Sequence, residues 1–170
     1  MGHQRVAFGM PWILSSVLTV GLTATPSDPP ARVQMAQGPE QRWALTAVEG
    51  AARRLSDPRC QQVLSDFTDP TGLTLFEGLA LRRLSPLDHV RDVWFLKGDT
   101  QPLCNKRTTS AFTVAGGRLV FMCPRLFRRQ VSKYDELLLI HEILHTLGLG
   151  ENPPSSDAIT KQVAVRCGEL

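Results

Sequence analysis

Apolar residues recur at helical spacing in the first part of the domain, and an Asp-Pro pair ends the run. We therefore predict a first helix over residues 40–56. A second, short helix is plausible around residues 60–67. A turn-forming sequence follows at residues 69–72, and the leucines of residues 73–84 then fit a helix or mixed structure equally well.

Two later runs are short, rich in β-branched or aromatic residues, and bounded by turn residues, as strands are. They span residues 93–97 and residues 118–122. Residues 111–114 stand before Gly116-Gly117, and so complete a hairpin with the second run. The pattern thus predicts a small sheet between helical segments.

The best-defined element is a helix over residues 132–147. Ser132 and Asp135 have the spacing of a capping box, no helix breaker follows until Gly148, and Gly148 ends the helix. Its apolar residues lie almost all round the axis, which predicts a buried helix. These residues are Leu137, Leu138, Leu139, Ile140, Ile143, Leu144 and Leu147.

Beyond this helix a Pro-Pro pair enforces an extended stretch, and Ser155 or Ser156 can cap a last helix that runs to Cys167. A chain of 170 residues gives room for one domain with a substantial core. The expected fold is therefore α+β, with helices packed on a short, mainly antiparallel sheet and the helix over 132–147 at the centre.

The N-terminal segment is typical of an export signal. Arg5 is followed by an uncharged, largely apolar stretch over residues 6–25. We predict a signal peptide over residues 1–24, a flexible Pro-rich leader over 25–41 and the folded domain over 42–170. The expected location is secreted or periplasmic, without stable membrane insertion after cleavage; an uncleaved membrane anchor is the alternative.

Export is consistent with the cysteines, which form an even set without a CxxC pair. Of the three possible connectivities we prefer Cys104–Cys123, which closes a local loop, with Cys60–Cys167, which closes a long one. Four reduced, buried thiols become the better interpretation if the N-terminal segment does not direct export.

The net charge of +3 is small, and the basic residues are scattered instead of forming a stripe interleaved with aromatic residues. We therefore expect no nucleic-acid partner.

The candidate chemistry lies on the predicted buried helix. His141 and His145 are four residues apart, so both imidazoles lie on one face and can reach one metal ion. Glu142 can point toward the same ion and take a proton from water. Alternatively, the three polar groups are satisfied by hydrogen bonds in the core. Desolvation disfavours that alternative, since a metal supplies one partner for two of them at once.

A catalytic zinc site needs a third protein ligand. Glu151 is the first candidate, because Gly148 lets the chain turn back within a few residues of the helix end. Its alternative is a solvated loop carboxylate. Three further candidates are held in reserve: His89, Asp157 and Glu169.

Residues 141–151 read HEILHTLGLGE, which resembles the metzincin signature HExxHxxGxxH with glutamate in the last place. The resemblance to zincin metalloproteases implies that His141, His145 and Glu151 bind Zn²⁺ and that Glu142 is the general base. It also implies a strand above the active-site helix, either residues 118–122 or their hairpin partner, that aligns a peptide or protein substrate.

The chain departs from that family in two respects. No methionine follows Glu151, so the Met-turn is missing, and only nineteen residues remain for a lower subdomain. No tyrosine or histidine follows His145 to stabilise an oxyanion. The nearest residue types that could substitute are His89, Tyr134, Lys161 and Arg166.

The first hypothesis is an exported zinc metallopeptidase that hydrolyses peptide bonds with Glu142 as general base. The second is a non-catalytic, exported zincin-like binding or structural protein, which the short C-terminal part favours. A purely structural zinc site is disfavoured, because such sites usually have four protein ligands.

Overall fold

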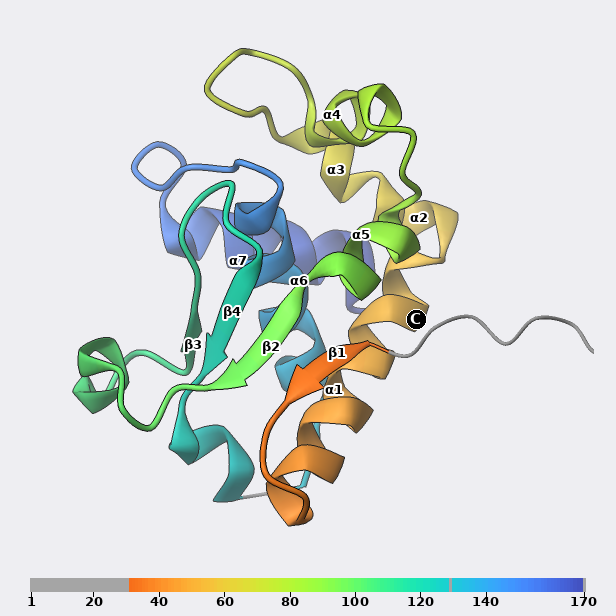
Figure 1. Ribbon diagram of the computed structural model, residues 1–170. Helices are drawn as coiled ribbons and strands as arrows, with labels where there is room; N and C mark the ends of the chain where they lie inside the picture. Colours follow the sequence, from red (N-terminus) through yellow and green to blue (C-terminus); the bar gives the residue numbers. More distant parts are fainter. Residues whose placement is uncertain (1–30, 129, 170) are drawn as a thin grey trace, which may run out of the picture.

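The computed structural model describes residues 31–128 and 130–169 (Figure 1). The predicted signal peptide and the first part of the predicted leader lie outside these residues. Among the helices that the structure describes, none is both long and apolar enough to cross a membrane.

The sheet has four strands in the order β1-β2-β4-β3. They are β1 (Arg32–Gln34), β2 (Trp94–Lys97), β3 (Ala111–Phe112) and β4 (Leu119–Met122). The predicted strands and the β3–β4 hairpin are confirmed.

The expectation of a mainly antiparallel sheet was wrong. β2 runs parallel to both β1 and β4, and only the β3–β4 pair is antiparallel. After β2 the chain reverses direction and forms β3, and the hairpin then reverses it again. β4 therefore runs in the same direction as β2. The unexpected strand β1 then adds a second parallel pair.

That strand lies in the stretch expected to be a flexible leader, residues 25–41. Within its described part, β1 pairs with β2, and α1 (Pro39–Leu55) begins before residue 42. Pro39 occupies the first turn of α1, where a missing backbone N–H costs nothing. Val33 and Met35 pack against the core. The folded unit therefore includes residues 32–41.

The first helical region is as predicted, with α1 in place of residues 40–56. Two short helices, α2 (Pro58–Gln61) and α3 (Val63–Asp66), stand where one was plausible. The stretch that was left open contains α4 (Leu75–Leu81), which begins with a capping box, and α5 (Pro86–Asp92) follows it.

The predicted buried helix is α6 (Lys133–Thr146), and its Ser132–Asp135 capping box is present. Leu139, Ile140 and Leu144 are fully buried. α6 packs against α1, α7 and the β3–β4 hairpin, and Figure 1 shows it between the sheet and α7. The central position of this helix is therefore confirmed.

The last helix, α7 (Ser156–Cys167), is capped by Ser155, whose hydroxyl accepts a hydrogen bond from Ala158 N. Two 3₁₀ helices complete the described elements: η1 (Pro102–Asn105) and η2 (Pro124–Arg128).

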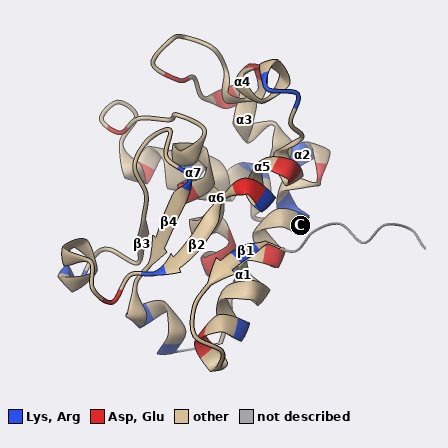
Figure 2. Cartoon of the chain, viewed as in Figure 1, with Lys and Arg blue, Asp and Glu red and all other residues tan. Residues whose placement is uncertain are grey.

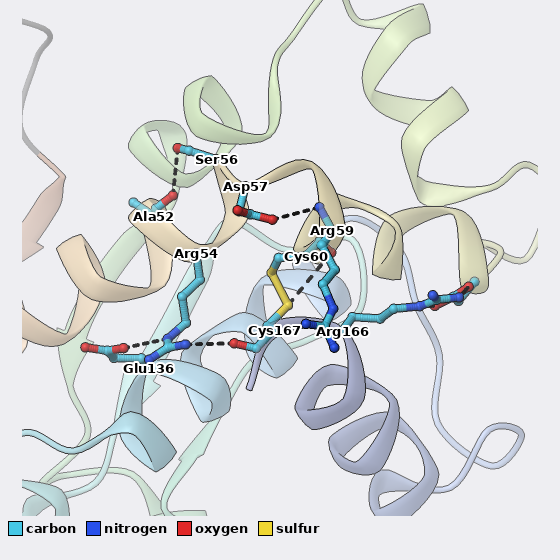
Figure 3. Close-up of a disulfide and its surroundings, with 10 residues drawn as sticks. Ala52, Arg54, Ser56, Asp57, Arg59, Cys60, Glu136, Arg166 and Cys167 are labelled. Carbon is cyan, nitrogen blue, oxygen red and sulfur yellow. Dashed lines mark hydrogen bonds and ion pairs between the residues drawn. A yellow bond between two sulfur atoms is a disulfide. The ribbon is translucent and has the colours of Figure 1, made fainter. Parts of the chain in front are cut away.

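Both preferred disulfides are confirmed. Cys60–Cys167 joins α2 to the end of α7 (Figure 3), and Cys104–Cys123 joins η1 to the end of β4. Arg54 strengthens the first junction, because its side chain donates to the carbonyl oxygen of Cys167 and pairs with Glu136. Two disulfides are consistent with an exported protein.

Candidate metal centre

Helix α6 places His141 and His145 one turn apart on a buried face. Their Nε2 atoms are 3.1 Å apart, and both side chains are almost fully buried. Since one helical turn brings both imidazoles to the same side, this pair follows directly from the four-residue spacing.

Glu151 approaches the pair from the turn that follows α6. Gly148 has φ +112°, a conformation that favours glycine, and it sends the chain back over the helix end. Glu151 Oε1 then lies 3.9 Å from His141 Nε2 and 3.7 Å from His145 Nε2. The potential ligand atoms of the three residues all lie within 4.8 Å of one another, so the group could hold a metal ion.

The outer nitrogen of each imidazole has its own partner. His145 Nδ1 lies 2.7 Å from the carbonyl oxygen of Leu149, and His141 Nδ1 lies 3.0 Å from Thr160 Oγ1. A carbonyl oxygen only accepts hydrogen bonds, so His145 carries its proton on Nδ1 and presents the lone pair of Nε2 to the group.

The potential ligand atoms of His141, His145 and Glu151 are of the chemical types that bind metal ions. The pKa of His141 is lowered to about 4, mainly by burial and also by the neighbouring His145, while Glu151 opposes the shift. The imidazole of His141 is therefore available as a neutral ligand near neutral pH. Two imidazoles and one carboxylate are ligands that first-row metal ions such as zinc accept.

Glu142 lies next to the group without belonging to it. Its side chain is only 5% exposed, yet it lines the same cleft as the two histidines. The pKa of Glu142 is raised to about 8, mainly by burial and also by the neighbouring Glu151. A carboxyl group that changes protonation near neutral pH can accept and return protons.

The cleft has a volume of about 470 Å³, and hydroxyl groups dominate its polar lining. They come from the segment around β3 and from α7: Thr108, Thr109, Ser110, Thr113, Ser156 and Thr160. No lysine, arginine or tyrosine is among the lining residues that the structure describes.

Strand β3 forms one wall of this cleft. It is the last strand of the sheet order, so among the described strands only β4 pairs with it. The hairpin is tied to α6, because Gly116 N donates to the carbonyl oxygen of His145 at 2.8 Å. The free edge and the histidines are thus held at a fixed separation.

The ligands held in reserve are not brought to the group. His89 lies on α5, where its Nε2 is 2.8 Å from Thr146 Oγ1. Thr146 Oγ1 donates to the carbonyl oxygen of Ile143, so it accepts from His89. Glu169 pairs with Arg59, and Asp157 does not line the cleft.

His89 is a buried neutral histidine with a structural role. Its pKa is lowered to about 4, mainly by burial and also by the charges of Arg82 and Arg118, while Asp92 opposes the shift. Its hydrogen bond ties α5 to α6.

The residues suggested for oxyanion stabilisation do not line the cleft either. Arg166 forms an ion pair with Asp66, Tyr134 is 75% exposed, and neither Lys161 nor His89 is among the lining residues. Figure 2 shows basic residues distributed over several elements instead of gathered in one place.

The sequence analysis missed Thr160. Ser156 and Thr160 are one helical turn apart, which places them on one face of α7, but nothing in their spacing indicates that this face meets α6.

Comparisons of the chain with protein-family models, with curated proteins and with solved structures find no match.

Proposed function

We propose that this protein is an exported, zinc-dependent hydrolase of peptide bonds. The observation that carries the proposal is the placement of a buried carboxyl group, Glu142, beside a compact His141, His145 and Glu151 group in one cleft. Two disulfides support export, and the predicted signal peptide over residues 1–24 remains part of the proposal.

Zinc is the proposed metal because two imidazoles and one carboxylate form a common catalytic zinc set, which leaves one position for water. When bound, it supplies Lewis-acid polarisation of water and of a carbonyl group. A three-ligand group in an open cleft argues against a structural site, which usually has four protein ligands.

The chain's own residues supply the proton transfers. Glu142 accepts a proton from the attacking water and returns it to the leaving amine. Its burial supports this role, since a pKa near 8 lies close to neutral pH and makes both directions of transfer accessible. Leu149 and Thr160 hold the outer nitrogens of the two histidines during the reaction.

An extended peptide is the proposed substrate because β3 offers a free edge along the cleft. A peptide can add to such an edge as a further strand, and main-chain hydrogen bonds then fix its position over the helix. This arrangement of a hairpin edge beside a metal-binding helix also supports the resemblance to zincins. The parallel β1–β2 pair lies at the opposite side of the sheet, and the parallel β2–β4 pair lies at its centre, next to β3.

The test compares the native protein with Glu142→Gln and His145→Ala. We expect one zinc per chain in the native protein and in Glu142→Gln. We expect peptide hydrolysis by the native protein alone, with a loss of at least about a hundredfold in Glu142→Gln. Equal hydrolysis by native protein and Glu142→Gln would refute the catalytic role, and a native protein without affinity for zinc would refute the site.

A non-catalytic, exported binding protein is the second candidate. The observation that favours it is the described lining of the cleft, which contains no cationic or phenolic side chain to stabilise an oxyanion. In that case the zinc-loaded native protein hydrolyses no peptide in a broad library, while native protein and Glu142→Gln bind the same peptides equally well.

A further inference from the structure

Helix α7 contributes a direct contact to the candidate metal group. Thr160 Oγ1 lies 3.0 Å from His141 Nδ1, across a sequence separation of 19 residues. The corresponding nitrogen of His145 needs no side-chain partner, because the carbonyl oxygen of Leu149 serves it. His141 is therefore the ligand whose orientation depends on a side chain from another helix.

The chemistry of the imidazole gives this contact its importance. His141 points Nε2 toward His145 and Glu151, so binding a cation there requires that the ring proton sit on Nδ1. A proton on Nδ1 is favoured where an acceptor faces it, and the hydroxyl oxygen of Thr160 is such an acceptor. Removal of the acceptor frees the ring to rotate and to place its proton on Nε2, where it blocks the ligand.

The helix that carries Thr160 is fixed to the domain at both ends. Ser155 caps its first turn, and the buried Ile159 and Val163 pack into the core. At its other end Arg166 pairs with Asp66, and Cys167 is bonded to Cys60. Figure 3 shows this end with the Cys60–Cys167 disulfide and the hydrogen bond from Arg54. The hydroxyl of Thr160 is thus presented by a rigid support.

We propose that Thr160 is a positioning residue of the metal centre, which holds the imidazole of His141 in the tautomer and orientation that zinc binding requires. The proposal rests on the proposed function for the identity of the metal, and it extends the site to the C-terminal helix. Thr160 acts on the metal group through His141.

Three variants of the full chain separate this role from a general effect on α7. Thr160→Val keeps the shape of the side chain and removes the hydroxyl. Thr160→Ser keeps the hydroxyl. Ser156→Ala removes a hydroxyl that lines the same cleft one turn earlier and for which the structure describes no hydrogen bond to either histidine. Thermal unfolding of each metal-free variant checks that the fold is retained.

Zinc affinity, measured by competition with a chromophoric chelator, is the first readout. Loss of an outer partner of a ligating histidine weakens metal binding by about 10–100-fold. We expect the lower end, about tenfold, for Thr160→Val, because Thr160 is exposed and water can replace part of the contact. Thr160→Ser should stay within about twofold of the native affinity, since it keeps the acceptor, and Ser156→Ala should not differ from it.

The second readout is the orientation of the His141 ring in the metal-free protein, measured by NMR from side-chain couplings and NOEs. We expect one fixed ring orientation in the native protein and in Thr160→Ser, which keep the contact to Nδ1, and averaging between orientations in Thr160→Val. This measurement needs neither zinc nor activity, so it distinguishes failure of this inference from failure of the proposed function.

Two outcomes would overturn the inference. One is an unchanged orientation of the His141 ring and an unchanged zinc affinity in Thr160→Val. The other is an equal loss of affinity in Thr160→Val and Thr160→Ser, which would place the effect in packing rather than in the hydroxyl group.

Discussion

Removal of the Cys60–Cys167 disulfide should cost the protein more stability than removal of Cys104–Cys123. The first bridge spans 107 residues of sequence and the second spans 19. A crosslink stabilises the folded state mainly by limiting the unfolded chain, and the effect grows with the logarithm of the loop length.

That relation gives about 5 kcal/mol for the longer loop and about 3 kcal/mol for the shorter one at 25 °C. The Cys104–Cys123 loop lies within the Cys60–Cys167 loop and therefore shortens the longer loop when both disulfides are formed. This shortening is too small to change which disulfide stabilises more. Since domains are stable by about 5–15 kcal/mol, loss of Cys60–Cys167 removes a large share of the total.

The assay is urea unfolding of two double variants, Cys60→Ala with Cys167→Ala and Cys104→Ala with Cys123→Ala. Alanine avoids a new polar group where Cys60, Cys167 and Cys123 are fully buried. A chelator must be present, because bound metal would add its own stabilisation. A larger loss for the Cys104–Cys123 pair would refute the loop-length argument and would assign the stability to the local packing around η1 and β4.

Three further changes test other parts of the molecule. Gly148→Ala should destabilise the fold by about 1–3 kcal/mol in chemical unfolding, because a side chain is strained at φ +112°. Glu151→Gln should weaken zinc binding in chelator competition more than Thr160→Val does, since it removes a charged ligand and not an outer partner. The pKa of His89 is about 4 in the folded state and 6.5 in the unfolded state, so the folded state favours the neutral ring. The resulting contribution to the free energy of unfolding is fully present above pH 6.5. It is lost as the pH falls from 6.5 to about 4, which costs roughly 3 kcal/mol. His89→Gln should accordingly show a shallower loss of unfolding free energy over that range, and an unchanged slope would contradict the burial of a neutral ring.

Local sequence rules predicted the parts of the site that lie on one continuous segment. The four-residue spacing put His141 and His145 on one face, and the conformational freedom of Gly148 returned Glu151 to them. Residues 132–147 carried both their cap and their apolar pattern in the sequence, so the burial of the helix was predictable as well.

The sheet was harder to predict because its pairings join distant segments. β1 is three residues long, stands next to a Pro-rich stretch, and pairs with β2 about sixty residues further on. Such a strand has too few residues to show an alternating pattern. Its parallel direction follows from the path of the chain between strands, which local propensity does not contain.

The role of α7 shows the same limit at the site itself. Only nineteen residues follow Glu151 in the sequence, which seemed few for a lower subdomain. Twelve of them form α7, and its docking against α6 brings Ser156 and Thr160 to the cleft. That docking depends on the Cys60–Cys167 disulfide and on the ion pair of Arg166, both made with residues about one hundred positions earlier in the chain.

The stability of the fold and the geometry of the candidate metal group are therefore linked through α7. The disulfide holds the end of this helix, and the helix presents the hydroxyl that faces His141. If the link is as we infer, the variant without Cys60–Cys167 should lose zinc affinity even under conditions where it remains folded, because α7 is then freer to move Thr160 away from the ring. The variant without Cys104–Cys123 leaves α7 in place. When the same fraction of both variants is folded, this variant should therefore keep the orientation of His141. If zinc affinity instead fell in proportion to the free energy of unfolding in both variants, the loss of affinity would be due to unfolding alone and not to movement of α7.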